Sequence, residues 1–167
     1  MSIAELLLVE FDEEMKQTRV ALERVPADKK EFAPHVKSMP LGKLAPHVAG
    51  LNELALTILT TPEYEFAKGS RKPLLFESSA DLVKAWDESA AKVRSALQGI
   101  PEAAWNEDWK LMFEGKAVFK GSRFLAYRRM YMNHLVHHRA QLGVYLRLND
   151  LPVPATFGPS ADDRLGF

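Results

Sequence analysis

Apolar residues recur at steps of three and four along four separate stretches of this chain, and this periodicity constrains the fold more than any other feature. Such spacing places side chains on one face of an α-helix. The four stretches cover about residues 2–24, 38–60, 79–97 and 122–149. In the first, the apolar stripe consists of Leu7, Phe11, Met15, Thr18 and Leu22. Four amphipathic helices in one chain predict an all-α fold, a four-helix bundle.

The acidic side chains of the first stretch lie opposite its apolar stripe, so we expect Asp12, Glu13 and Glu14 to face solvent. The second stretch has Ser38 as its candidate N-cap. Its stripe consists of Leu44, His47, Leu51, Leu54 and Ile58. Pro46 lies inside this pattern and removes a backbone hydrogen bond, which predicts a kink just before His47.

The segments between the helices carry turn-forming residues. We expect a loop over residues 61–77, and a short hairpin or extended segment over 109–120, around Glu114-Gly115. The third helix, 79–97, has a capping serine and a stripe made of Leu82, Trp86, Ser89, Val93 and Leu97. The tail, 151–167, contains three prolines and is predicted to be loop. No linker or internal repeat divides the chain, so residues 1–167 form one predicted domain.

Composition excludes several classes of function. Acidic and basic residues cancel at 22 each, so nothing favours nucleic acid or an anionic membrane as a partner. No apolar run is long enough to span a bilayer, and the first residues lack a signal-peptide pattern, so we expect a cytoplasmic protein. The chain has no cysteine, and any metal ion must therefore be held by histidine or carboxylate.

Three of the five histidines lie within five positions of the fourth helix. A spacing of four places His134 and His138 on one face, one turn apart, as two nitrogen ligands from one helix require. His137 is the alternative to His138, because only one of the two can lie close to the line along the helix on which His134 lies. We choose His138, since a spacing of four suits chelation slightly better than a spacing of three.

His47 lies on the core stripe of another helix. Taken alone it is more often a hydrogen-bonded core residue, and His-x-x-x-His spacings also arise by chance. The pair on the fourth helix and His47 support each other as ligands, because burying two or three imidazoles without partners costs a few kcal/mol each. A shared metal ion satisfies all of them at once.

Two segments resemble the DinB/YfiT-like family of metal-dependent proteins. Residues 38–49, SMPLGKLAPHVA, are similar to the motif of its second helix, and 133–142, NHLVHHRAQL, to that of its fourth. The tail from Leu151 is also similar. The resemblance covers nearly the whole chain and implies an up-down-down-up bundle that is often a homodimer. It also implies a zinc or nickel site with three histidines, which carries over to His47, His134 and His138.

Three neutral imidazoles leave a divalent ion its charge and an open position. Such an ion can lower the pKa of bound water, polarise a carbonyl or hold a thiolate. Together with the resemblance to the family, whose characterised members include thiol-dependent transferases, this implies a hydrolase or a thiol-dependent transferase acting on a small molecule. The low-molecular-weight thiol as cosubstrate is implied by the resemblance alone. No general acid or base can be assigned. Tyr127, Tyr131, Asn133 and Gln141 are candidates to bind substrate or support the ligands, although packing is the commoner role for each. We expect Arg139 to form a salt bridge outside the bundle, and the three tryptophans to fill the core or line a cleft.

Two alternatives to an enzyme stay open. One is a metal- or ligand-binding stress-response protein without turnover. The other is an interaction bundle whose histidines are merely packed. Bound metal without activity would favour the first, and a melting temperature that chelation leaves unchanged would favour the second.

Overall fold

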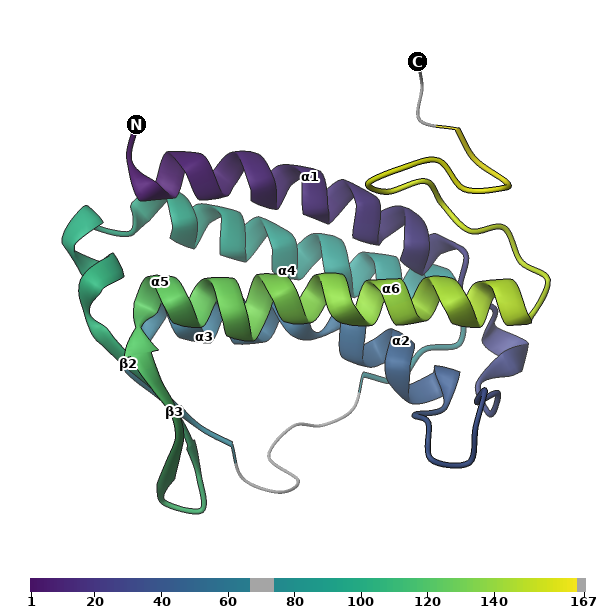
Figure 1. Ribbon diagram of the computed structural model, residues 1–167, viewed down its shortest axis with the longest axis horizontal. Helices are drawn as coiled ribbons and strands as arrows, with labels where there is room; N and C mark the ends of the chain where they lie inside the picture. Colours follow the sequence, from purple (N-terminus) through teal and green to yellow (C-terminus); the bar gives the residue numbers. More distant parts are fainter. Residues whose placement is uncertain (67–73, 165–167) are drawn as a thin grey trace.

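The computed structural model describes residues 1–66 and 74–164 and is mostly helical (Figure 1). Helix α1 spans Ile3–Glu23 and α4 spans Ser79–Gly99, and the two lie side by side. The second helical stretch is divided into α2 (Leu41–Ala49) and α3 (Leu51–Thr60). The last consists of α5 (Arg123–Ala126), a π-helix η3 (Tyr127–Met132) and α6 (Asn133–Leu148). Two short 3₁₀ turns, η1 (Ala27–Lys29) and η2 (Glu102–Asn106), lie in the connections.

A small three-stranded sheet closes one end of the bundle, so the prediction of a purely α-helical fold is wrong in this detail. The hairpin of β2 (Asp108–Phe113) and β3 (Lys116–Ser122) turns at Glu114 and Gly115, as the sequence predicted. Both turn residues have positive φ, which suits a two-residue hairpin turn. β1 (Glu63–Glu65) pairs with β2 in parallel, inside a segment expected to be loop. Within the rest of that expected loop, residues 67–73 lie outside the described residues.

The sheet also fixes the direction of two helices. β1 follows α3 and β2 follows α4, and the two strands run parallel, so α3 and α4 both end at the sheet end of the molecule. The buried side chains of the four helical stretches form one core. Trp86, Trp105 and Trp109 are fully buried in it, which decides between the two places expected for them. No helix among the described residues is long and apolar enough to cross a membrane.

The second helical stretch begins later than predicted and breaks at a different residue. Pro40, not Ser38, is the N-cap of α2, and the first amide groups of the helix donate to the carbonyl oxygens of Phe32 and Lys30. Pro46 is accommodated inside α2, and the chain changes direction at Gly50. The break divides the helix just after the turn that carries His47.

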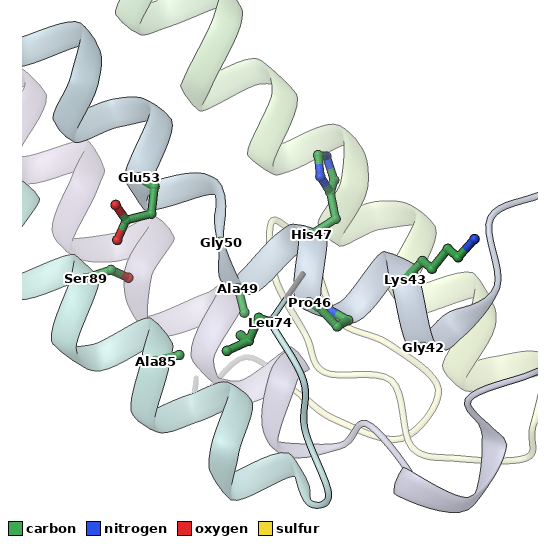
Figure 2. Close-up of a pocket in the computed structure, with 10 residues that line it drawn as sticks. All are labelled: Gly42, Lys43, Pro46, His47, Ala49, Gly50, Glu53, Leu74, Ala85 and Ser89. Carbon is green, nitrogen blue, oxygen red and sulfur yellow. The ribbon is translucent and has the colours of Figure 1, made fainter. Parts of the chain in front are cut away.

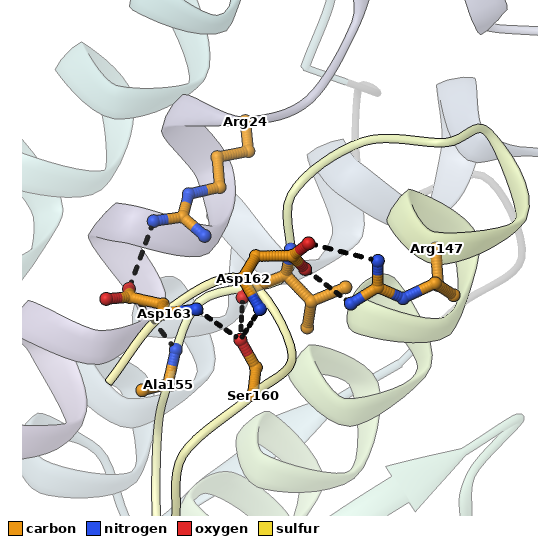
Figure 3. Close-up of polar contacts among 7 residues, drawn as sticks. Arg24, Arg147, Ala155, Ser160, Asp162 and Asp163 are labelled. Carbon is orange, nitrogen blue, oxygen red and sulfur yellow. Dashed lines mark hydrogen bonds and ion pairs between the residues drawn. The ribbon is translucent and has the colours of Figure 1, made fainter. Parts of the chain in front are cut away.

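The C-terminal tail folds back over the ends of α1 and α6 without helix or strand, as predicted for its described part. Two ion pairs hold it there, Arg24 with Asp163 and Arg147 with Asp162 (Figure 3). The hydroxyl of Ser160 donates to a backbone carbonyl and accepts from the amide groups of both aspartates. The ion pairs therefore fix the tail to the bundle, and the hydrogen bonds of Ser160 hold the fold of the tail itself.

Candidate metal centre

The structure brings His47, His134 and His138 together between α2 and α6. The Nε2 atoms of His47 and His134 are 3.3 Å apart, and one ring nitrogen from each of the three histidines lies within 4.8 Å of the others. The ring centroids are 4.5 Å apart for His47 and His138 and 4.6 Å for His134 and His138. All three side chains are half-buried, so they are shielded by the two helices but open on one side.

The spacing between the nitrogens fits one small divalent ion. Zinc–imidazole bonds of about 2.0–2.1 Å in a tetrahedral site place ligand nitrogens about 3.3 Å apart. The pair His47 and His134 already has this separation. Bringing the widest pair of the cluster to the same separation needs a relative shift of about 1.5 Å at most. Side-chain rotations can supply that shift, so the three residues can hold a metal ion.

Two of the imidazoles are oriented by hydrogen bonds on the side away from the cluster. The Nδ1 atom of His138 lies 2.7 Å from Oε1 of Gln141, and Nδ1 of His134 lies 3.3 Å from the carbonyl oxygen of Met130. Both oxygens are acceptors, so Nδ1 carries the proton in each ring. The lone pair is then on Nε2, where a metal ion would be bound.

The sequence places these ligands through two local irregularities. Met130 belongs to the π-helix, whose wider turn ends directly before Asn133 and sets the rotation of α6. π-helical turns of this kind occur frequently at functional sites. On the other side, the break at Gly50 follows His47 by less than one turn.

Burial lowers the pKa of His138 from its usual value, and nearby His137 acts in the same direction. The hydrogen bond with Gln141 opposes these effects. A lowered pKa keeps the imidazole neutral at neutral pH, and the neutral form is the one that binds metal.

His137, the sequence alternative to His138, is exposed and is not part of the three-histidine group. Its ring packs against His138 with a centroid separation of 4.8 Å. Among the other predicted residues, Gln141 contacts a candidate ligand and Asn133 is exposed. Tyr127 and Tyr131 are fully buried, so they pack in the core rather than line an open site.

Tyr131 begins a buried chain of polar groups that the sequence did not predict. Its hydroxyl donates to Oδ1 of Asn52 at 2.6 Å, and Nδ2 of Asn52 donates to the hydroxyl of Ser89 at 3.1 Å. Ser89 in turn donates to the carbonyl oxygen of Trp86. The chain joins the π-helix, α3 and α4, one turn before His134. An asparagine between the apolar residues Leu51 and Leu54 was the sequence signal for it.

Two expectations about charge were wrong. Arg139 is buried, with 4% of its surface exposed, and its partner is Glu14, which is also buried. Nη1 of Arg139 donates to Oε2 of Glu14 at 2.5 Å and to the hydroxyl of Thr18 at 3.2 Å. Helix periodicity correctly placed Arg139 on a different face of the helix from the histidines. That face is not exposed, however, because α1 covers it.

A cavity of about 460 Å³ lies on the other side of α2, next to α4. Its lining includes Glu53, Leu74, Ala85 and Ser89, and His47 contributes to it as well. Figure 2 shows the ring of His47 pointing toward α6, away from Ala85 and Leu74. The candidate ligands therefore lie between α2 and α6, and this cavity lies behind them.

Comparisons with known proteins agree with this architecture. Two solved structures of DinB-like proteins, from Bacillus cereus and Bacillus subtilis, are each 18% identical to the chain, with TM-scores of 0.70 and 0.67. The first match covers 92% of this chain and 97% of the other, and the second covers 88% and 96%. At this identity they show a shared fold. No functionally curated protein matches the sequence. The model of the DinB family matches residues 1–163, so the chain belongs to the DinB family.

Proposed function

We propose that the protein binds one divalent metal ion, zinc or nickel, through His47, His134 and His138 and uses it as an enzyme acting on a small molecule. The observation that carries the proposal is the convergence of three imidazoles from two helices, with ring nitrogens within 4.8 Å of one another. Two of the rings already have their outer nitrogen bonded to oxygen, which leaves Nε2 for the ion.

The donor set decides the chemistry. A divalent ion held by three neutral ligands keeps its charge and an open position, where it can lower the pKa of water, polarise a carbonyl or hold a thiolate. The chain itself supplies orientation, because Gln141 and the carbonyl of Met130 fix the tautomers of two ligands. These properties support a hydrolase or a thiol-dependent transferase, with a low-molecular-weight thiol as the cosubstrate. We further propose a homodimer located in the cytoplasm.

Metal analysis of the purified protein and of matched variants tests the site. We expect about one zinc or nickel ion per chain, and loss of that metal in His47→Ala and in His138→Ala. His35→Ala is the control, because His35 is exposed and lies outside the three-histidine group. Metal well below one ion per chain after gentle purification, or metal retained in His47→Ala, would contradict the proposed ligands.

Turnover is tested separately with a panel of esters, amides and thiol–electrophile pairs. The enzyme proposal predicts that at least one reaction depends on metal and is lost in His47→Ala but kept in His35→Ala. Stoichiometric metal with no turnover over the whole panel would instead support a metal-binding stress-response protein without catalysis.

A further inference from the structure

A second cavity lies on the face of α6 opposite the histidines, beneath the C-terminal tail. Its volume is about 510 Å³, within the range typical of small-molecule sites. One wall is formed by α6, including Val136, Ala140 and Val144, and the other by the tail, including Val153 and Phe157. These side chains are apolar, so the cavity suits a ligand with a hydrocarbon body.

Among the described residues, the charged side chains that line this cavity are those of two arginines. Arg139 and Arg147 contribute to the lining, and no described acidic residue does. Their carboxylate partners, Glu14 and Asp162, lie outside the lining. A cavity with apolar walls and two guanidinium groups favours an anionic headgroup over a cationic one.

Arg139 has one nitrogen with hydrogen-bonding capacity to spare. Its Nη1 makes the bonds to Glu14 and Thr18, whereas Nη2 is buried and has no hydrogen-bond partner among the described residues. A buried donor on a charged group that lacks a partner is costly, so an acceptor oxygen at this position would be stabilising.

The side chain of Phe157 packs over the guanidinium group of Arg139. Its ring lies over the guanidinium at 5.3 Å, yet 68% of its surface is exposed. The tail that carries it is anchored just after Phe157, where Asp162 and Asp163 form the ion pairs of Figure 3. A rotation of the Phe157 side chain would uncover Nη2 while the anchored backbone stays in place.

We propose that this cavity is a binding site for a small monocarboxylate with an apolar chain, whose carboxylate accepts a hydrogen bond from Nη2 of Arg139. The site is separate from the three histidines, because Arg139 faces α1 whereas His138 faces α2. The bound molecule would hold the tail against α6 and join the C-terminus to the helix that carries two candidate metal ligands.

Isothermal titration of the zinc-loaded full chain with octanoate tests the proposal, with octylamine as a probe of the same chain length and opposite charge. We expect saturable binding of one octanoate per chain, at least ten-fold tighter than octylamine. Binding should persist in His47→Ala, which separates this cavity from carboxylate binding at the metal centre. Loss of octanoate binding in that variant would overturn the proposal.

Two variants locate the site. Arg139→Gln should weaken octanoate binding by ten-fold or more. Because that variant leaves Glu14 without its partner, Ala140→Trp is the second: Ala140 lines the cavity but is exposed, so a large side chain can fill the cavity without disturbing the core. Leu148→Trp, exposed on the same helix and outside the lining, is the control. No saturable binding, or equal binding in Ala140→Trp and Leu148→Trp, would overturn the proposal.

Discussion

Helix α6 carries two polar clusters on opposite faces, and they differ in how their polar groups are satisfied. On the face toward α1, Arg139 meets Glu14, and the two opposite charges are buried together. On the face toward α2, three imidazoles converge, with one ring nitrogen of each within 4.8 Å of the others. One cluster is neutralised within the protein, whereas the other gathers groups of the same kind.

This difference separates a structural cluster from a candidate ligand site. Opposite charges stabilise each other, so the charges of Arg139 and Glu14 compensate each other within the protein. Three ring nitrogens within 4.8 Å of one another can instead share one cation, which would stabilise all three together. The comparison predicts that variants of the first cluster change folding stability, and that variants of the second change metal binding.

The largest expected effect comes from removing one partner of the buried pair. Arg139→Met leaves the carboxylate of Glu14 buried without its cation, so we expect a loss of about 3–5 kcal/mol in the free energy of unfolding. Urea denaturation measures it. The double variant Arg139→Met with Glu14→Leu should recover most of the loss.

Arg94→Met is the control for that experiment, since Arg94 forms an exposed ion pair with Asp12 on the surface. Pairs of this kind contribute little to stability, so we expect no measurable change. If Arg139→Met were as harmless as Arg94→Met, the contrast between the two faces of α6 would be lost.

Chelation is expected to have the next largest effect, and it acts on the histidine face. A ligand present at about one hundred times its Kd stabilises the folded state by about 2.7 kcal/mol. We therefore expect the melting temperature of the zinc-loaded protein to fall when a chelator is added, and to recover with excess zinc. In His47→Ala the chelator should have no effect. An unchanged melting temperature in the unmutated protein would mean that the histidines are merely packed.

Gln141 should contribute less, because it touches a candidate ligand and not the ion. Gln141→Leu removes the acceptor of the His138 Nδ1 proton, and loss of such a supporting contact typically lowers metal affinity by about 10–100-fold. Competition titration with a zinc indicator measures the change. Gln98→Leu, the same replacement at an exposed position of α4, is the matched control and should bind zinc as the unmutated protein does.

The sequence predicted the helices that carry the candidate ligands better than the positions at which those helices break. Helical periodicity located all four helical stretches, and the spacing of His134 and His138 placed both on the face that meets α2. Periodicity reports only which residues share a face. It could not show that Pro46 fits inside α2 while the chain breaks at Gly50, because the outcome depends on packing against neighbouring helices.

The sequence analysis also did not predict which residues contact one another across the bundle. A single stripe on α6 indicated one buried face, but α6 is covered on two, so Arg139 and Glu14 were expected in solvent. The π-helix was missed for a related reason, since a wider turn leaves no mark in a pattern of threes and fours. The strand β1 was also missed, because its three residues are too few to show alternation.

The smallest expected effect is the pH dependence of the metal-free protein. The pKa of His138 is lowered in the folded state, so the unfolded chain binds more protons between that value and the usual one of about 6.5. The contribution of His138 is therefore intact above about pH 6.5 and is lost as the pH falls through its folded pKa. Three further imidazoles, those of His47, His134 and His137, adjoin it, so the informative quantity is a difference between two proteins. Urea denaturation of the chelated protein and of His138→Gln from pH 7.5 to 5 should show a shallower decline in the variant. Equal declines would show that the environment of His138 does not oppose its protonation, which would remove one reason for choosing it over His137.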